Sequence, residues 1–298
     1  AIRYLRSPLV ISSGQSILNP PSHIPSKCAV TSDSIVELTN TNKHANRMID
    51  RGMLRHSVDA IAAARNFEES RQGLNDIATA IDMPAIAWAQ DVSFPGVNPY
   101  MDSFFRAQGW SDEVLKLWWH RDIMLKAPLY IRCRFTAQPF VSRPLSSRLS
   151  SEVRKIGVLM DEMGLRSMLT VPVRLPRAQV AMVTWCGALS VEEAQNILTQ
   201  VRSELLLAAY YFCQFFASEM GSAEVEEEEF SRLTPREWEC LRLTAQGHRE
   251  AEAAALMDVS PTTVRFHLDN VVHKLGASTR THAVALAAQL GMLGPISP

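Results

Sequence analysis

Before residue 220, hydrophobic positions occur both at the three-to-four-residue spacing of helices and in short continuous runs typical of strands, which together predict a mixed α/β region. From about Ser57, apolar residues recur every three or four positions, which predicts an amphipathic helix with a break near Gly73. Helical spacing returns in 111–124 and again in 151–162, where Gly164 ends the helix. These segments present apolar faces for packing and carry no catalytic pattern.

Short apolar runs bounded by proline and glycine predict the strands. The runs cover 86–92, 129–135, 169–175 and 180–185. A long helix follows to about Ala217, because Ser190 can cap its first turn and Glu193 can return the hydrogen bond. Helices and strands alternate along the chain, so we expect a sheet sandwiched by helices.

The last part of the chain has only helical periods, and four short helices are predicted there. They cover 234–246, 248–257, 261–275 and 281–290. Thr234 and Ser260 are suited to cap the first and third helices, and Gly247 and Gly276 end them. The third helix carries Thr, Arg, His and Asn on its outer face after a tight turn. This arrangement is typical of a helix that lies in the major groove of DNA.

Charge divides the chain at a run of glutamates. Residues 1–223 hold 23 Lys and Arg against 20 Asp and Glu, whereas 231–298 hold 7 basic and 6 acidic residues. Between them, residues 224–230 contain five glutamates and no basic residue. Like charges at this density repel one another and bury nothing, so the run predicts a solvated linker or an exposed helix end.

The first forty or so residues are rich in proline and serine and have no sustained apolar period, so we expect no packed structure there. A translation start at Met48 or Met53 is an alternative explanation for this segment. The expected organisation is a disordered or mis-assigned extension at 1–52, a first domain at 53–220, an acidic linker at 221–230 and a second domain at 231–298.

Composition narrows the class of protein. The 298 residues are 47% hydrophobic and 20% charged with a net charge of -1, which is typical of a soluble globular chain and excludes a polycation. No apolar run approaches the roughly eighteen residues of a spanning helix, so no membrane association is expected. The five cysteines form no CxxC pair, which argues against a disulfide framework and a zinc site and favours the reducing cytoplasm.

Catalytic patterns are poor. His120-Arg121-Asp122 resembles a kinase catalytic loop, but Ala127 stands where the loop needs an asparagine. The sequence has no P-loop, GxGxxG, GxSxG or HExxH motif. We therefore expect a binding protein and not an enzyme, with no catalytic residue, no cofactor and no metal.

Aromatic residues gather in the predicted α/β region. Five of the six tryptophans lie between residues 88 and 185, together with Tyr100 and Tyr130. Large aromatics fill cores wherever they occur, and they also line ligand cavities. Both interpretations, an aromatic core and a pocket, stay open at this point.

The last sixty or so residues resemble the LuxR/FixJ helix-turn-helix family. Matching positions are held by Glu237, Leu241, Gly247, Thr263, Val264, His267, Asn270, Lys274, Leu275, Gly276 and Arg280. The resemblance implies that 261–275 is a recognition helix, with Arg265 as the main base-reading side chain because its fork pairs bidentately with guanine. The DNA-binding residues it implies are Thr262, Thr263, Arg265, Phe266, His267, Asp269, Asn270 and Lys274, with Thr262, Thr263 and Lys274 as phosphate contacts. Asp269 is either an acceptor for cytosine N4 or an exposed acid that screens Arg265.

The second helix of this region departs from the family pattern. Residues 249–253 read Arg-Glu-Ala-Glu-Ala where the family has a Ser or Thr cap followed by Asn-Lys-Glu-Ile. The capping hydroxyl and a phosphate-binding lysine are therefore absent. The balanced charge of 231–298 adds to this, so dimerisation, which doubles the DNA contacts, is expected to matter more.

The region before the glutamates resembles the autoinducer-binding domain of LuxR-type quorum-sensing regulators. Matching segments include Arg132, Arg134, Phe140 and 164–167. The family's Trp, Tyr and Asp places are held by Val114, Trp118 and Ala127, and Ser142 and Met168 replace a second Trp and a glycine. The ligand-binding residues that aromatic clustering and this resemblance suggest are Trp88, Trp118, Trp119, Tyr130 and Thr184.

The predicted fold is an α/β sensor domain, an α/β/α sandwich, followed by an all-α four-helix helix-turn-helix domain. The predicted function is a transcriptional regulator controlled by a small apolar signal, such as an acyl-homoserine lactone or a related molecule. It would bind double-stranded operator DNA as a homodimer in the cytoplasm. The alternatives are a ligand-independent regulator and an antagonist that heterodimerises with a related regulator and barely touches DNA.

Overall fold

The computed structural model shows an α/β domain and a helical domain, each with its own hydrophobic core. The residues that the structure describes are 49–92, 104–106, 108, 110–118, 127–144, 151–219 and 233–294. Of the extension predicted at 1–52, residues 1–48 lie outside the described residues, as does the acidic linker, whereas Arg51 and Gly52 belong to the first helix. Across the described part of the chain, no helix is long and apolar enough to cross a membrane.

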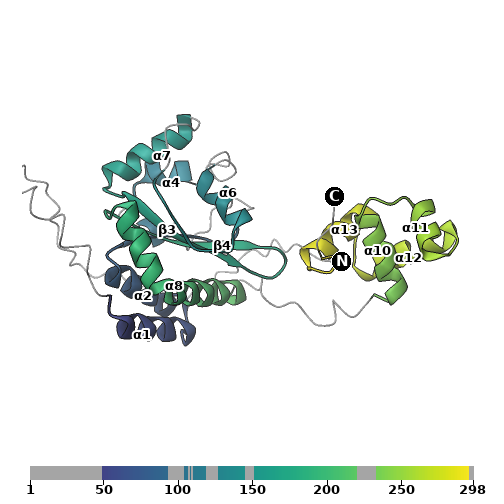
Figure 1. The fold of residues 1–298 in the computed structure, drawn as a ribbon, viewed down its shortest axis with the longest axis horizontal. Helices are drawn as coiled ribbons and strands as arrows, with labels where there is room; N and C mark the ends of the chain where they lie inside the picture. The colour runs from purple at the N-terminus through teal and green to yellow at the C-terminus, as the bar shows by residue number, and fades with distance from the viewer. Residues whose placement is uncertain are drawn as a thin grey trace, which may run out of the picture. The chain divides into compact units, whose positions relative to one another are not determined.

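A four-stranded antiparallel sheet in the order β1-β4-β3-β2 forms the centre of the α/β domain (Figure 1). Its strands are β1 (Ala85–Ala89), β2 (Phe140–Ser142), β3 (Ser167–Arg174) and β4 (Val180–Gly187). Three of them fall in predicted apolar runs, whereas the short strand β2 was not predicted. Strands β3 and β4 carry seven and eight buried positions respectively, because helices cover both faces of the sheet.

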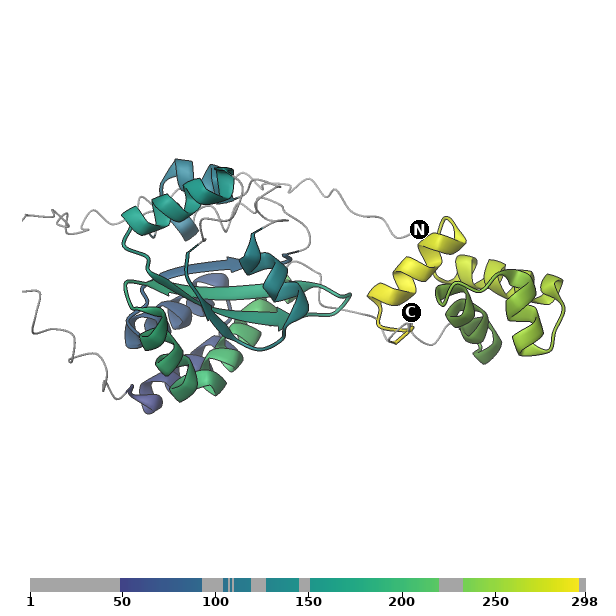
Figure 2. The ribbon, with the colours of Figure 1, turned by 45° about the horizontal axis from the view of Figure 1, so that its top comes forward.

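The helices form one layer on each face of the sheet, as the second view shows (Figure 2). One layer contains α1 (Arg51–Ala62), α2 (Phe67–Ala80) and α8 (Val191–Glu219), and the other contains α4 (Asp112–Trp118), α6 (Pro128–Phe135) and α7 (Ser151–Glu162). The predicted α/β/α sandwich is therefore confirmed. We call the face covered by α1, α2 and α8 the long-helix face and the opposite one the short-helix face.

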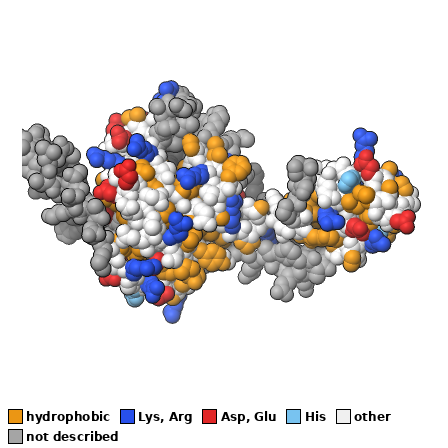
Figure 3. All heavy atoms as spheres, in the orientation of Figure 1, with side chains coloured by type: hydrophobic (Ala, Val, Ile, Leu, Met, Phe, Trp, Pro, Cys, Tyr) orange, Lys and Arg blue, Asp and Glu red, His pale blue; other side chains and the backbone are white. Residues whose placement is uncertain are grey.

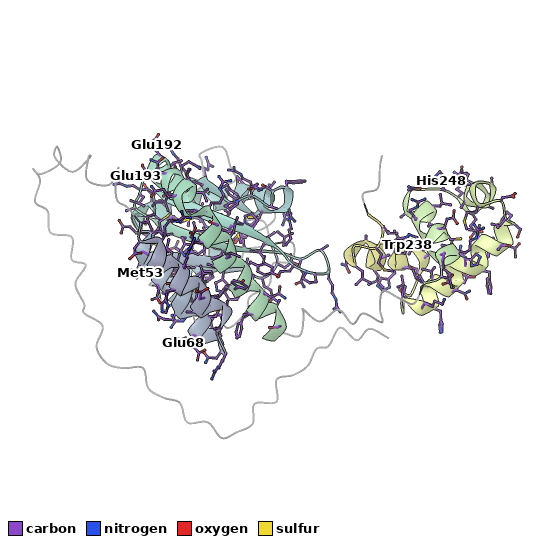
Figure 4. All side chains as sticks on the ribbon, turned by 60° about the horizontal axis from the view of Figure 1, so that its bottom comes forward. Met53, Glu68, Glu192, Glu193, Trp238 and His248 are labelled. Atoms are coloured by element: carbon purple, nitrogen blue, oxygen red, sulfur yellow. The ribbon has the colours of Figure 1, made fainter. Side chains whose placement is uncertain are left out.

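Side chains at the helix ends explain where helices begin. Asp50 accepts hydrogen bonds from the backbone of α1's first turn, so α1 begins at Arg51, earlier than the predicted start near Ser57. Figure 4 labels Glu193 at the start of α8. Ser190 Oγ accepts from the backbone N–H of Glu193 at 3.2 Å, and the Glu193 carboxylate accepts from the Ser190 N–H at 2.8 Å. This is the capping box that the sequence predicted.

The predicted helix break at Gly73 is wrong. Helix α2 runs through Gly73, and the break lies between α1 and the N-cap residue Asn66. Gly73 serves instead as a point of close approach between the two helices, because a Cβ there would lie 2.4 Å from Cγ1 of Ile61 and 3.1 Å from the carbonyl oxygen of Ser57. Glycine is required at this position by packing and not by backbone conformation.

The predicted strand at 129–135 is also wrong, because these residues form α6. Pro128 occupies the first turn, where its missing N–H costs nothing. Leu129, Tyr130 and Cys133 are buried and Phe135 is exposed, which fits one face of a helix and not the alternation of a strand. Periodicity alone does not separate helix from strand in a run this short.

The helical domain contains four helices, as predicted. They are α10 (Pro235–Ala245), α11 (Glu250–Met257), α12 (Pro261–Lys274) and α13 (Arg280–Gln289). Figure 4 places Trp238 on α10 and His248 just before α11. Buried side chains of α12 separate into two clusters, one shared with α10 and α11 and one with α10 and α13. Helix α12 is thus fixed along its inner face by all three neighbours.

Candidate ligand site and DNA-binding surface

Strand register places the predicted ligand residues Trp88 and Thr184 on opposite faces of the sheet. Trp88 pairs with Val183, and Thr184 pairs with Ala87. Paired residues of antiparallel strands point to the same face and successive residues to opposite faces. The structure therefore does not bring these two side chains together.

Trp88 belongs to an aromatic cluster on the long-helix face. Its ring centroid lies 5.3 Å from that of Phe212 and 4.5 Å from that of Phe216, both on α8, and 6.0 Å from that of Phe67 on α2. Within the described residues, its buried Nε1 has no hydrogen-bond partner. These contacts give Trp88 a packing role between the sheet and α8.

Thr184 belongs to a pair of buried hydroxyls on the short-helix face. Its Oγ1 lies 3.0 Å from Oγ1 of Thr170, its partner across β3 and β4, and both residues are fully buried. Two strand positions away, the Met182 sulfur lies 3.8 Å from the Cys133 sulfur of α6. Ser142 on β2 points to the same face, and its buried Oγ has no partner among the described residues. Among the described residues, this interior is mostly apolar and contains the hydroxyls of Thr170, Thr184 and Ser142, together with the buried hydroxyl of Tyr130 on α6.

The helices of the short-helix face contribute the remaining positions of the family pattern. Val114 on α4 and Ala127 before α6, which hold the family's Trp and Asp places, are both buried. Tyr130 on α6 is also buried, and burial raises its pKa well above its ordinary value, with the Cys133 sulfur acting in the same direction. Helix α4 ends at Trp118, but that side chain and all of Trp119 lie outside the described part of the chain.

Two departures from the family pattern are neighbours in space. Ser142 stands in place of a Trp and Met168 in place of a glycine, and the two residues pair across β2 and β3. A large residue has become small and its cross-strand partner has become large. Met168 is buried. In this cross-strand pair the bulkier side chain is therefore that of Met168 on β3, and the smaller one is that of Ser142 on β2.

Thr170 and the Ser142 hydroxyl were not predicted as site residues. Thr170 lies in a predicted strand, but only the register with β4 shows that it faces Thr184. Among the described residues, no group of His, Cys, Asp and Glu is placed to hold a metal ion.

In the helical domain, α12 presents one face to the core and a second to its surroundings. Val264, Leu268 and Val271 are buried, which is the spacing of one helix face. Ser260 caps the helix, with its Oγ 3.1 Å from the backbone N of Thr263 and 2.8 Å from the Thr263 hydroxyl. The predicted DNA-binding residues that are exposed on α12 are Thr262, Arg265, Phe266 and Asp269, and those that are half-buried are Thr263, His267, Asn270 and Lys274.

Arg265 is held by a carboxylate from another helix. Its Nε and Nη2 donate to Oε2 of Glu250, at 3.2 and 2.9 Å, while 62% of the side chain is exposed. Arg280 at the start of α13 bonds to the other oxygen of Glu250, and its Nη2 donates to Oδ1 of Asp269 at 2.8 Å. The hydrogen-bonded partner of Asp269 is thus Arg280 and not Arg265. These bonds join α11, α12 and α13 into one network.

Lys274, predicted as a phosphate contact, has a partner inside the domain. Its Nζ lies 2.6 Å from Oε2 of Glu237, a side chain that is only 3% exposed. The same carboxylate accepts from the backbone N–H of Thr234 at 2.7 Å, which completes the capping box of α10. Burial by itself raises the pKa of Glu237, but hydrogen bonds from Lys274 and Thr234 outweigh it, so the pKa is lowered. This pair joins α10 to the end of α12.

The departure in α11 leaves its N-terminus partly capped. Arg249 stands at the cap position and makes no capping bond with its side chain, but its backbone N–H donates to Oε2 of Glu252 at 2.8 Å. On the face seen in Figure 3, basic and acidic side chains of the helical domain lie interspersed and form no broad basic patch. The picture agrees with the nearly balanced charge of the sequence.

Two family profiles match the chain. The profile described as the autoinducer binding domain matches residues 66–215, about half of the chain. The profile described as bacterial regulatory proteins of the luxR family matches residues 231–287. The chain belongs to the LuxR-type regulators. This membership confirms both resemblances, with a sensor domain followed by a helix-turn-helix domain, and the family is one of transcriptional regulators.

Individual relatives match over shorter stretches. A putative HTH-type transcriptional regulator of Sinorhizobium fredii, y4qH, is 33% identical over 130 residues, which are 44% of this chain and 38% of that protein. The quorum sensing-dependent regulator RpaR of Rhodopseudomonas palustris is 44% identical over 63 residues, 21% of this LuxR-type chain and 26% of the relative. The matches thus span less than two fifths of these relatives' lengths. The crystal structure of Escherichia coli SdiA covers 82% of this chain and 99% of its own, with 17% identity and a TM-score of 0.49.

Proposed function

We propose that this LuxR-type regulator binds operator DNA as a homodimer in the cytoplasm and that a small, largely apolar molecule controls this binding. The observation that supports the DNA part is the exposed face of α12. A helix fixed to its domain by Val264, Leu268 and Val271, with Arg265 and Phe266 exposed, offers a guanidinium fork for guanine and an apolar group for a thymine methyl.

The ligand would bind on the short-helix face of the sheet. Of the two hydroxyl protons of Thr170 and Thr184, their mutual hydrogen bond uses one, and neither hydroxyl has another partner within the described residues. The second proton needs an acceptor, because a buried donor without a partner is costly. A ligand carbonyl oxygen supplies that acceptor, and the apolar side chains around it suit an acyl chain.

One residue on the short-helix face disfavours the amide contact that an acyl-homoserine lactone would make. Ala127 stands where a carboxylate would accept the amide hydrogen of an acyl-homoserine lactone, and a methyl group accepts nothing. We therefore propose an acyl compound held through a carbonyl oxygen at Thr170 and Thr184. Its amide, if it has one, would be held elsewhere.

Coupling between the two domains follows from linkage. A molecule that binds only the folded, dimer-competent sensor domain stabilises that state by RT ln(1 + [L]/Kd), or about 2.7 kcal/mol at a hundred times Kd. Each dimer makes twice the DNA contacts of a monomer, so a higher fraction of dimer raises the occupancy of the operator. This matters here because the charge of 231–298 is nearly balanced.

A second candidate, a ligand-independent regulator, is favoured by the buried side chains at the family's ligand positions. Val114, Ala127 and Met168 are all buried, so the chain's own residues would fill the space. The antagonist that barely touches DNA is the third candidate. It is supported by the missing lysine in α11.

Arg265→Ala tests the DNA part directly. The full chain would be used to select duplexes from a randomised pool, and affinity for the selected duplex measured by fluorescence anisotropy at fixed salt. Arg265→Ala should weaken binding by roughly 10- to 100-fold, as expected for the loss of a bidentate base contact. Arg236→Ala, which removes an equal charge from an ion pair with Glu239 on α10, should change it by less than about threefold. Equal effects of the two variants would contradict the assignment.

A further inference from the structure

The contact between Arg265 and Glu250 uses only one edge of the guanidinium. Nε and Nη2 lie on the same edge, and both donate to Oε2 of Glu250. Within the described residues, Arg265 makes no other hydrogen bond. The end of the fork, formed by Nη1 and the outer N–H of Nη2, therefore stays available. Bidentate recognition of guanine needs two parallel N–H groups, which that end supplies.

Glu250 is itself fixed in place from the opposite side. Arg280 bonds to its Oε1, so each carboxylate oxygen has its own guanidinium. Asp269 on α12 in turn holds Arg280 at 2.8 Å. Hydrogen bonds from Arg265 and then Arg280 lower the pKa of Glu250, so the carboxylate stays ionised at neutral pH. Two cations and two anions balance, which removes the net repulsion that a lone carboxylate would exert on a phosphate backbone.

We propose that Glu250 is a positioning residue for DNA recognition: it holds the Nε edge of Arg265 so that the end of the fork faces a guanine. This inference rests on the proposed DNA-binding role of Arg265. An exposed arginine loses rotamer entropy when it binds a base, and a carboxylate that fixes its orientation beforehand removes part of that cost. Glu250 would thus raise discrimination between bases while it adds no base contact of its own.

The alternative is that Glu250 competes with DNA for Arg265. The two roles predict opposite effects of Glu250 on affinity for the selected sequence. A positioning carboxylate strengthens binding to the selected sequence and leaves binding to unrelated DNA unchanged or slightly weaker. A competing carboxylate weakens both.

The test uses the full chain and its selected duplex, a scrambled duplex of equal length, and selected duplexes in which single guanines carry 7-deazaguanine, which lacks the N7 acceptor. Glu250→Gln should weaken binding to the selected duplex by about three- to tenfold, which converts to roughly 0.7–1.4 kcal/mol. Binding to the scrambled duplex should stay equal or tighten. The loss caused by 7-deazaguanine at the site read by Arg265 should shrink in this variant.

Two controls separate positioning from folding and charge. Glu252→Gln removes the same charge from the same turn of α11, contacts neither Arg265 nor Arg280, and keeps an acceptor for the Arg249 N–H, so it should preserve the ratio of selected to scrambled affinity. In an Arg265→Ala background, Glu250→Gln should cause no further loss, whereas a purely structural role would lower affinity in both backgrounds.

Specific outcomes overturn the inference. Tighter binding of Glu250→Gln to both duplexes would show competition, and an unchanged affinity ratio would show that Glu250 does not position the arginine. If Arg265→Ala itself has no effect on the selected duplex, the proposed function fails at this residue. If Arg265→Ala weakens binding but Glu250→Gln leaves discrimination intact, only the positioning role fails.

Discussion

Lys274 and Glu237 form an ion pair of 2.6 Å between the end of α12 and the first turn of α10, with the carboxylate almost fully buried. The Lys274 side chain is 32% exposed, so solvent reduces the strength of the pair. A lysine that is held in this way positions α12 within the domain. The ion pair gives Lys274 a role in the stability of the domain, and its predicted phosphate contact stays a prediction.

Replacing Lys274 by Met should destabilise the helical domain by about 1–3 kcal/mol, because the buried carboxylate loses its cation while Thr234 still donates to it. The measurement is a urea series on the full chain with pulsed hydrogen exchange of peptides from α10 and α12. The control is Arg236→Met, which breaks the exposed ion pair with Glu239 within α10 and should change stability by less than about 1 kcal/mol. Equal stability of the two variants would contradict the structural role.

The same pair predicts a pH dependence. The pKa of Glu237 is lowered by folding, so its contribution to stability is complete above the ordinary value of 4.5 and is lost as pH falls through the lower, folded value. Stability of the helical domain should therefore decline below about pH 4.5. Glu237→Gln should flatten that decline in the same urea series. If stability falls equally with pH in the variant and in the wild type, other carboxylates cause the decline.

Trp88→Phe should leave ligand binding unchanged and lower the stability of the α/β domain by about 1–2 kcal/mol, because the ring packs against α8 and its Nε1 has no partner within the described residues. Thr184→Val should weaken ligand binding and change stability less, because valine keeps the side-chain volume while it removes the hydroxyl that pairs with Thr170. Loss of a buried polar partner should lower ligand affinity by about tenfold. Ligand retention by each variant, purified from the host, is the measurement. Ligand loss in Trp88→Phe alone would place the site on the long-helix face.

Gly73→Ala should destabilise the α/β domain by about 1–3 kcal/mol, because the added methyl meets Ile61 across the interface of α1 and α2. Gly52→Ala, also within a helix, is the matched control. There the nearest atom is the side-chain oxygen of Asp50 at 3.2 Å, the oxygen that caps α1, so a small shift of this exposed side chain should offset the gain in helix propensity. The change in stability should therefore stay within about 0.5 kcal/mol. Thermal unfolding followed by circular dichroism gives both values. A stable Gly73→Ala protein would mean that the helices pack less closely.

The buried thiols should be unreactive. Burial raises the pKa of Cys133 and of Cys186 to about 12, and it also raises the pKa of Cys213 and Cys240. Since the thiolate is the reactive form, a Cys28→Ser variant should not react with a thiol reagent at pH 8 until it unfolds. All four should then react in denaturant. Rapid labelling of the native variant would reveal an open interior.

The sequence predicted the helical domain almost completely, because caps and glycines mark its helix ends locally. Thr234 and Ser260 cap the first and third helices as predicted, whereas the return bond from Glu237 to Thr234 was not predicted. The α/β domain was predicted less well. The run 129–135 is too short for its period to decide between strand and helix, and Gly73 serves a contact with Ile61 that no local pattern contains.

The candidate sites depended on contacts between distant segments. Trp88 and Thr184 both lie in predicted strands, but their faces follow from the register of β1 with β4, which a sequence does not specify. Glu250 was noted only as a departure from the family pattern. Its bonds to Arg265 and Arg280, fifteen and thirty residues away, exist only once α11, α12 and α13 have packed.

Native mass spectrometry of the protein purified from its own host, with a denatured aliquot to identify released molecules, tests the central claim most directly. We predict a stoichiometric small molecule with an acyl carbonyl in the wild-type protein, retained by Trp88→Phe and lost or reduced in Thr184→Val. An empty wild-type protein that is nevertheless dimeric and binds its selected duplex would contradict ligand control and support the ligand-independent regulator.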